Sequence, residues 1–348
     1  QGNVQTSDEV LRREMRQFEA TWYSQAAIDR SKIRLQRLGY FETVEIETPA
    51  VAGTKDQVDV VVTVKERNAG SFVFGIGYSQ EGGAVVSVQL SQNNFLGTGN
   101  RFGIGLSRNN YSKAINFNYQ DPYFTQDGVS VGYNLSYSDY DQSTTSTARY
   151  SAGNAAGEAT FGIPLSENTS FSTAIGIYRN KITTTDGVTP QSISDYLVNT
   201  MGERERFVSY TIETDPDNDL LIPTVPLFIP GANRQWVVNA WTLKAGWAID
   251  TRNSYLFPSY GTLHRVGAEV SLPGSDLTYW RLNYEFEHYK PLGKYLILKT
   301  GLDLGYGDGY GDTSEEGLPF YKNFYAGGPG SVRGFQAHTL GPLDRSSP

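Results

Sequence analysis

The histidines of this chain, and the carboxylates beside one of them, are the residue types best suited to catalysis or metal binding. The sequence contains His264, His288 and His338, and Glu285 and Glu287 stand just before His288. In an alternating strand, however, the two glutamates point to one face and His288 points to the other. We therefore expect a structural histidine near a strand end, and no catalytic residue, metal site or cofactor.

A second distinctive stretch is the glycine-rich run Gly327–Phe335, which contains the motif Val332, Arg333, Gly334 and Phe335. Its glycines and proline predict a bent, close-packed loop. The Arg333 guanidinium is a rigid fork of donors, suited to a carboxylate in a partly enclosed space. The run is not a phosphate cradle, because no Gly-Lys-Ser/Thr follows it. Taken alone, it is equally compatible with an exposed loop that carries an incidental arginine.

The composition favours a β-rich chain over a soluble enzyme. Among 348 residues there are 37 glycines, 23 tyrosines and 17 phenylalanines, and only 39% of residues are hydrophobic. A transmembrane β-barrel alternates lipid-facing with lumen-facing residues, so its mean hydropathy resembles that of a soluble protein. The net charge of −8 argues against a nucleic-acid partner. Because the chain has no cysteine, disulfides and thiolate metal sites are excluded.

Residues 1–67 predict a small α/β module. The apolar periodicity indicates, in order, helices over 8–19 and 25–38 and strands over 41–46 and 57–65. Val10, Met15, Phe18 and Trp22 have helical spacing after an N-cap, and Gly39 suits the C′ position of the second helix. A generic α/β linker domain would show the same pattern.

From Ser71 onward the sequence predicts about eleven strands, each with one apolar face and one small, polar or charged face. They are centred on 71–79, 86–91, 101–107, 115–120, 129–137, 154–163, 171–178, 241–247, 265–270, 280–287 and 296–305. This is the pattern of a transmembrane antiparallel β-barrel with a wet interior. A soluble β-sandwich also alternates, but its apolar face is the core and its strands are commonly shorter.

Connector lengths orient the barrel. Connectors after even-numbered strands are mostly short, and the longest connector, over 183–235, follows an odd-numbered strand. Barrels have short periplasmic turns and long outer loops, so residues 1–67 are expected in the periplasm. The same parity puts Val332–Phe335 in an outer loop that can fold into the lumen. The inward carboxylates that could receive Arg333 are Glu269, Glu285, Glu287 and Asp303, unless these charges simply line a solvated channel.

Together with the preceding module, four strings resemble the BamA family of outer-membrane assembly factors. They are Asn93–Asn100, Asp121–Phe124, Asp250–Gly261 and Val332–Phe335. Residues 1–67 resemble a POTRA domain, through the 8–19 helix, Arg37–Phe41 and Val58–Arg67, and 68–348 correspond to the barrel with its long outer loop. The resemblance covers essentially the whole chain. It implies a chain truncated at both ends, lacking most of the first POTRA strand and the last strands of a barrel of roughly sixteen.

The resemblance implies a protein that folds and inserts β-barrel clients into the outer membrane of a Gram-negative bacterium. Its implied partners are unfolded outer-membrane protein clients, outer-membrane lipid and periplasmic accessory lipoproteins, with no nucleic acid. The first strand would be a lateral gate whose edge pairs with client strands by β-augmentation. In this chain the edge comprises Ser71, Phe72, Val73, Phe74, Gly75, Ile76, Gly77, Tyr78 and Ser79. The motif Val332–Phe335 would dock in the lumen through Arg333. The resemblance implies acidic partners for Arg333 on strands beyond the eleventh, so Glu269, Glu285, Glu287 and Asp303 are second-choice partners.

Two questions about this edge stay open at the level of sequence. Gly75 and Gly77 either weaken a strand that must open or make room in a crowded lumen. A proline at Val73 or Gly75 would harm insertion only if the N–H of that residue faces the open edge.

Two other functions compete with client insertion. A polypeptide-secreting translocator of the same superfamily also joins a periplasmic module to a barrel with an arginine-bearing loop. A diffusion porin is the weaker alternative, because porins lack the preceding module.

Overall fold

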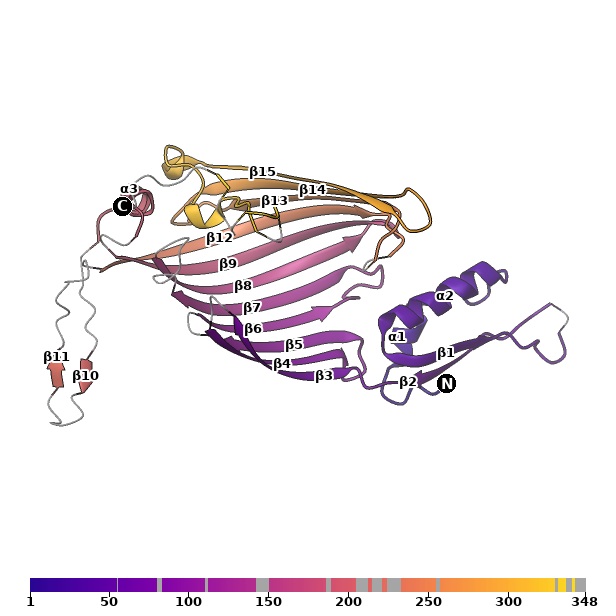
Figure 1. Cartoon of the computed structure of the whole chain (residues 1–348). Helices are drawn as coiled ribbons and strands as arrows, with labels where there is room; N and C mark the ends of the chain where they lie inside the picture. The colour runs from indigo at the N-terminus through magenta and orange to yellow at the C-terminus, as the bar shows by residue number, and fades with distance from the viewer. Residues whose placement is uncertain are drawn as a thin grey trace.

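The chain folds into a large curved antiparallel sheet with a small α/β module at one end (Figure 1). The computed structural model describes residues 1–54, 56–79, 83–109, 112–141, 150–185, 189–204, 212–214, 221–223, 233–254, 257–328, 331–335 and 340–341. The sheet has 11 strands, and each pairs with its neighbours in sequence order. They are β3 (Gly70–Ser79), β4 (Gly83–Phe95), β5 (Asn100–Arg108), β6 (Ser112–Asp121), β7 (Ser130–Asp141), β8 (Tyr150–Pro164), β9 (Thr169–Thr185), β12 (Asn233–Asp250), β13 (Gly261–Ser271), β14 (Tyr279–Pro291) and β15 (Ile297–Gly309). The expected strands are therefore confirmed.

One face of this sheet is an apolar belt. Its exposed members include Phe72, Phe74, Ile76, Val86, Leu90, Leu106, Ile115, Leu135, Ile175, Ile177, Trp241, Leu243, Trp247, Val266, Leu282, Leu302 and Leu304. The opposite face carries charged residues, among them Glu158, Lys244 and Glu269. Exposed apolar surface on this scale is stable only against lipid, so the apolar face is the outer wall and the charged face is the lumen.

Three strands are longer than the alternation predicts, because one face of their outer ends is covered by α3 and by Phe320 of the last connector. β8, β9 and β12 continue past the belt toward the end of the sheet opposite the module, where α3 (Gln191–Met201) lies (Figure 1). There Ile182, Trp236 and Val238 are buried with Leu197 of α3. The expected connector over 183–235 thus contains a helix that the polar sequence did not reveal, and a short hairpin of β10 (Ile212–Thr214) and β11 (Leu221–Pro223).

The module contains α1 (Asp8–Arg12), α2 (Gln25–Leu38), β1 (Phe41–Glu47) and β2 (Val61–Glu66). The second helix is confirmed, and Gly39 follows it in the left-handed region with φ 74°. The core is formed by Val10, Leu11, Leu35, Tyr40, Phe41, Val44 and Val64. Among the described residues, no helix is long and apolar enough to span a bilayer.

The expected first helix over 8–19 is wrong beyond Arg12. The Arg16 N–H donates to Ser31 Oγ of α2 at 2.8 Å, so the chain bends toward α2 and the helix stops. As a result Phe18 and Trp22 are not core residues, with 66% and 95% of their surfaces exposed. Likewise β2 begins at Val61 rather than 57, and Val58 stays exposed.

Glu66 ties the first residues of the chain to β2. Its carboxylate accepts hydrogen bonds from the backbone N–H groups of Val4, Gln5 and Thr6 at 3.1, 3.0 and 2.7 Å. Partial burial alone would raise the pKa of Glu66, but hydrogen bonds from Thr6, Gln5 and Val4 outweigh it and hold this pKa below its usual range. Because the pKa is depressed in the folded state, the stabilisation is present above the unfolded pKa and is lost as pH falls through the folded value.

Glu66→Gln is expected to loosen this attachment at neutral pH. Amides of residues 4–8 should exchange roughly threefold to tenfold faster at pH 7, since a charge-assisted acceptor is replaced by a neutral one and the site is partly solvated. The measurement is hydrogen exchange on the full chain, corrected for the intrinsic effect of pH. The difference between variant and parent should shrink below about pH 4, where the parent carboxylate is also protonated. A difference that persists in acid would contradict the role of the charge.

Candidate functional site

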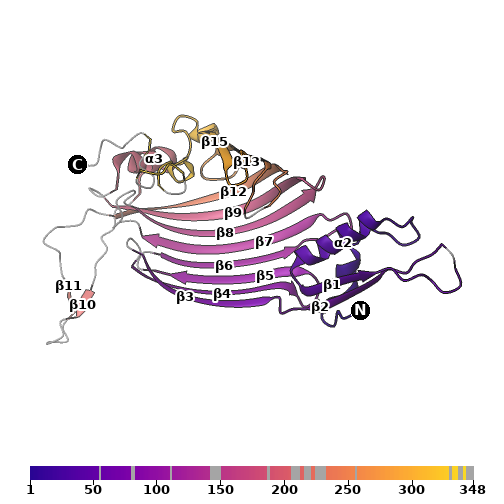
Figure 2. The same cartoon turned by 45° about the vertical axis from the view of Figure 1, so that its right-hand side comes forward.

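β3 is an outer strand of the described sheet. It pairs with β4 along its whole length, from Gly70 opposite Gln92 to Ser79 opposite Gly83, and with no other described strand. Figure 2 shows β3 at the margin of the sheet, next to the module. One row of its backbone groups is therefore available for a further strand.

The register determines which residues supply that row. The Asn93 N–H donates to Ala69 O at 2.9 Å, and Gly70 lies opposite Gln92, so Ala69 and Asn93 form a hydrogen-bonded pair. Such pairs alternate along an antiparallel ladder. Odd-numbered residues of β3 therefore direct their N–H groups to β4, and even-numbered residues direct theirs to the open edge. The edge donors are Phe72, Phe74, Ile76 and Tyr78.

This parity corrects the sequence-based choice of proline sites. The N–H groups of Val73 and Gly75 face β4. A proline at either position would therefore remove a hydrogen bond of the β3–β4 ladder and would leave the donors of the open edge in place. The side chains of Phe72, Phe74, Ile76 and Tyr78 are exposed on the belt face. Each of these four residues therefore has both an open backbone donor and an exposed apolar side chain.

The inner face of β3 is lightly packed. Ser71 Oγ lies 2.6 Å from Ser91 Oγ. A Cβ on Gly75 would lie 2.6 Å from Ser87 Oγ, the tip of a flexible side chain, whereas a Cβ on Gly77 would have nothing within 4 Å. Among the described residues, no atom crowds the position of Gly77, and a glycine within a strand weakens it.

The turn between β4 and β5 joins the sheet to the module. The Ser7 N–H donates to Gly97 O at 3.0 Å, and the Tyr40 hydroxyl donates to Gly99 O at 3.0 Å. Asn94 has φ 70°, and its side chain accepts from the Gly99 N–H at 2.7 Å and donates to Thr6 Oγ1 at 2.8 Å. Since Gly97 has φ 78° and a Cβ there would lie 1.9 Å from Gln5 O, the string Asn93–Asn100 is shaped by its contact with the module.

A second turn, after β6, also contacts the module. We call the contacts of these two turns with the module the joint. Arg13 lies over the ring of Tyr123 at 4.4 Å, and Arg34 donates to the Tyr123 hydroxyl at 3.1 Å. Arg34 also pairs with the buried carboxylate of Glu14 at 2.9 Å and reaches Glu167, in the turn after β8, at 3.6 Å. The motif Asp121–Phe124 thus contributes an aromatic platform between two arginines of the module.

The turn after β12 is held by Arg252. Its guanidinium pairs with Asp250 at 2.7 Å and with Glu287 of β14 at 3.1 Å. The hydrogen bond to Asp250 raises the pKa of Arg252 above its usual value despite burial, so the charge is permanent. Gly261 closes the turn with φ 106°, where a Cβ would lie 2.4 Å from Thr251 O.

Three of the four inward carboxylates form ion pairs in the described part of the chain. Glu269 pairs with Lys322 at 2.5 Å, and Glu285 pairs with Arg265 at 2.9 Å. Glu287 pairs with Arg252 and also with Lys299 at 2.6 Å, while Asp303 lies opposite Glu285 in the register of β14 and β15. His288 stacks on Phe286 of the belt face, as its alternation predicts.

The motif Val332–Phe335 forms an exposed turn. Gly328 N–H donates to Phe335 O at 3.1 Å and Gly327 N–H donates to Ser331 Oγ at 2.8 Å, so the run closes on itself as a compact loop. Within the part of the chain that the structure describes, Arg333 forms no ion pair with the four candidate carboxylates. Docking of Arg333 in the lumen stays a prediction.

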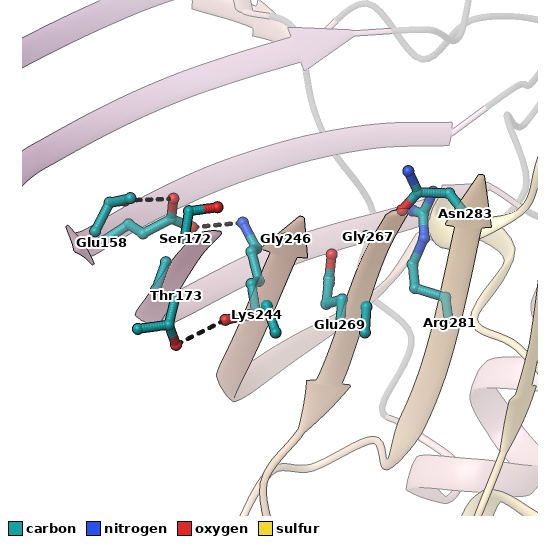
Figure 3. Close-up of a pocket in the computed structure, with 13 residues that line it drawn as sticks. Glu158, Ser172, Thr173, Lys244, Gly246, Gly267, Glu269, Arg281 and Asn283 are labelled. Atoms are coloured by element: carbon teal, nitrogen blue, oxygen red, sulfur yellow. Dashed lines mark hydrogen bonds and ion pairs between the residues drawn. The ribbon is translucent and has the colours of Figure 1, made fainter. Parts of the chain in front are cut away.

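A polar hollow of about 340 Å³ opens on the lumen side of β8, β9, β12, β13 and β14. Figure 3 shows Lys244 and Glu269 on neighbouring strands, with Glu158 to one side and Arg281 to the other. Lys244 forms an ion pair with Glu158, and its Nζ donates to the Tyr178 hydroxyl at 2.7 Å. Sequence reasoning did not single out Glu158 and Lys244. The inward position of each in its strand was the available signal.

The apolar belt, the charged lumen and the jointed module define an outer-membrane β-barrel protein with a periplasmic α/β module. A family model described as Omp85 superfamily domain matches residues 94–347, and a POTRA model described as surface antigen variable number repeat matches residues 1–67. The chain belongs to the Omp85 superfamily.

Its relatives include bacterial assembly factors. The chain is 34% identical over 344 residues to outer membrane protein assembly factor BamA of Neisseria meningitidis serogroup B, covering 98% of this chain and 39% of that protein. The crystal structure of BamA from Haemophilus ducreyi lacking POTRA domains 1–3 matches with TM-score 0.73 at 34% identity, covering 98% of this chain and 60% of that one. A shorter match, 34% over 102 residues, is to the mouse sorting and assembly machinery component 50 homolog, covering 29% of this chain and 21% of that protein.

These findings locate the barrel in the outer membrane of a Gram-negative bacterium and the module on its periplasmic side. The Arg37–Phe41 stretch of the POTRA resemblance supplies Tyr40 to the joint. The chain itself spans 39% of the length of the meningococcal relative.

Proposed function

We propose that this chain folds and inserts β-barrel proteins into the outer membrane, with β3 as the lateral-gate edge that receives a client strand. The observation that supports this most directly is the edge row of Phe72, Phe74, Ile76 and Tyr78, because each combines an open backbone donor with an exposed apolar side chain. In hydrocarbon an unsatisfied backbone group costs several kcal/mol, so a client strand gains stability by pairing there.

The mechanism needs no catalytic residue and suits clients of any sequence. Backbone groups are common to all strands, so pairing selects for extended conformation rather than for particular side chains. The apolar side chains of β3 continue the belt, so a strand added to this edge extends a lipid-compatible surface. The reaction is a change of hydrogen-bonding partners and of solvent, in which no covalent bond changes.

The proposed partners follow from the same surfaces. Unfolded outer-membrane protein clients pair with β3, and outer-membrane lipid contacts the belt. Periplasmic accessory lipoproteins contact the module, whose Phe18 and Trp22 are exposed. Val332–Phe335 is the outer-loop motif that we propose to dock through Arg333.

The alternative is a polypeptide-secreting translocator of the same superfamily. The two functions separate in liposomes that contain the full-length protein with this sequence and an unfolded client barrel. Insertion predicts that the liposomes accelerate the appearance of protease-resistant, heat-modifiable client in the bilayer. Delivery of unfolded polypeptide into the liposome interior, with no acceleration of barrel folding, would overturn the proposal.

A further inference from the structure

The connector after β15 returns to the lumen wall at Lys322, thirteen residues after the strand ends at Gly309. It forms two short 3-10 turns, η1 (Gly311–Thr313) and η2 (Phe320–Lys322). Lys322 ends the second turn with only 19% of its side chain exposed, and its Nζ lies 2.5 Å from Glu269 Oε1 of β13, whose side chain is 14% exposed. A charged pair therefore crosses from an outer connector to the inner wall of the barrel.

Two tyrosines of the wall enclose this pair. Lys322 Nζ lies 5.4 Å from the ring centroids of both Tyr178 on β9 and Tyr279 on β14. The Tyr279 hydroxyl donates to Glu269 Oε1 at 2.6 Å, so one residue contacts both the cation and the carboxylate. Aromatic faces and a hydrogen-bonded carboxylate together hold the ammonium group of Lys322, and the Tyr178 ring is shared with Lys244, whose Nζ lies 5.2 Å from its centroid.

The residues on either side of Lys322 are also seated on the wall. Phe320 packs edge-on against Tyr150 of β8 and Tyr196 of α3, at 5.2 and 6.0 Å. Arg281 of β14 lies over the Phe324 ring at 4.6 Å. That ring occupies the space above Gly305 of β15, where a Cβ would lie 2.4 Å from a ring carbon.

We propose that Lys322 is a positioning residue that latches the outer loop to the lumen wall through Glu269. Phe320 and Phe324 pack the segment against the lumen wall, and the ion pair fixes its position there. The run Gly327–Phe335 follows directly, so the latch sets where that motif emerges. This inference concerns the loop alone and holds whichever polypeptide the barrel handles.

The pair is expected to behave as a unit. When one partner of a buried pair is removed, the other is left as an uncompensated charge in a poorly hydrated site. Loss of Lys322 and loss of Glu269 should therefore release the same segment, and loss of both should do little more than loss of either. Independent contacts would give additive effects.

A double-mutant cycle read by hydrogen exchange tests the latch. Lys322→Met, Glu269→Gln and the double variant are compared with the parent in the full-length protein in lipid nanodiscs. Amides of residues 311–325 should exchange about tenfold faster in each single variant and about as fast in the double variant. Lys322→Arg, which keeps the charge, should restore most of the protection. Lys299→Met is the matched control, because it removes a lysine that pairs with Glu287 between strands at 2.6 Å and should leave this segment unchanged.

Unchanged exchange in Lys322→Met, or effects of the two single variants that simply multiply, would overturn the latch. Failure of Lys322→Arg to restore protection would overturn the role of the charge. If Lys322→Met does not give a folded barrel, Tyr279→Phe provides the second test. It removes only the hydroxyl that holds Glu269 and should accelerate exchange about threefold. No acceleration there would equally overturn the proposal.

Discussion

Phe74→Pro is expected to leave the barrel folded and to slow client insertion roughly tenfold or more. The N–H of Phe74 faces the open edge of β3, so proline removes a donor that the β3–β4 ladder does not use. Proline is tolerated at such edge positions of a sheet. An incoming strand, however, loses that hydrogen bond and meets the pyrrolidine ring in its place. The measurement is the rate of client folding in liposomes.

Two comparisons isolate the backbone effect. Phe74→Ala removes the same aromatic side chain but keeps the N–H, so it should insert clients clearly faster than Phe74→Pro. Val73→Pro takes a donor from the internal ladder and should instead lower the stability of the barrel itself. Equal rates for Phe74→Pro and Phe74→Ala would count against strand pairing at this edge.

Gly97→Ala is expected to separate the module from the first periplasmic turn. Its left-handed backbone, with φ 78°, costs about 1–3 kcal/mol for a residue with a side chain. The added Cβ would also lie 1.9 Å from the carbonyl oxygen of Gln5, and a backbone atom cannot move aside as a side chain can. The contacts of Ser7 and Thr6 with this turn should then be lost, and Arg13 should leave the face of Tyr123.

Trypsin cleavage after Arg13 in the full-length protein measures this separation. We expect cleavage about tenfold faster in Gly97→Ala than in the parent. The reason is that the substitution lowers the free energy of local opening by more than about 1 kcal/mol. Gly53→Ala is the matched control, because Gly53 has φ 88° and a Cβ there would meet nothing within 4 Å, so this variant carries the strain without the collision. Equal cleavage in the two variants would mean that backbone strain alone, and not the joint, is responsible.

The sheet was predictable because lipid outside and water inside impose opposite demands on alternate residues. Trp241, Leu243 and Trp247 could be assigned to the belt from their spacing alone, and Lys244 between them to the lumen. The same logic failed where the apolar environment changes sides. In the outer half of β12 the lumen-side residues Trp236 and Val238 are buried with Leu197 of α3 while Asn239 on the other face is exposed, so the alternation is inverted there.

Contacts between distant segments were beyond the reach of the sequence. The sequence motif drew attention to Arg333. Lys322 lies in the same connector, in a segment whose composition is typical of a solvated loop, and yet it pairs with Glu269. The carboxylate was correctly placed in the lumen by its alternation in β13. Its partner depended on how the connector folds back, which no local pattern encodes. Phe18 and Trp22 fit helical spacing, but the contact of Arg16 with Ser31 ends the helix before them.

The parity of the open edge restricts how a strand can move along it. A shift by one residue would exchange the lipid-facing and lumen-facing side chains of the incoming strand and misalign its donors with those of Phe72, Phe74, Ile76 and Tyr78. A shift by two residues restores both. The registers that the proposed pairing allows a client strand at β3 are therefore about 7 Å apart, two residues at a time.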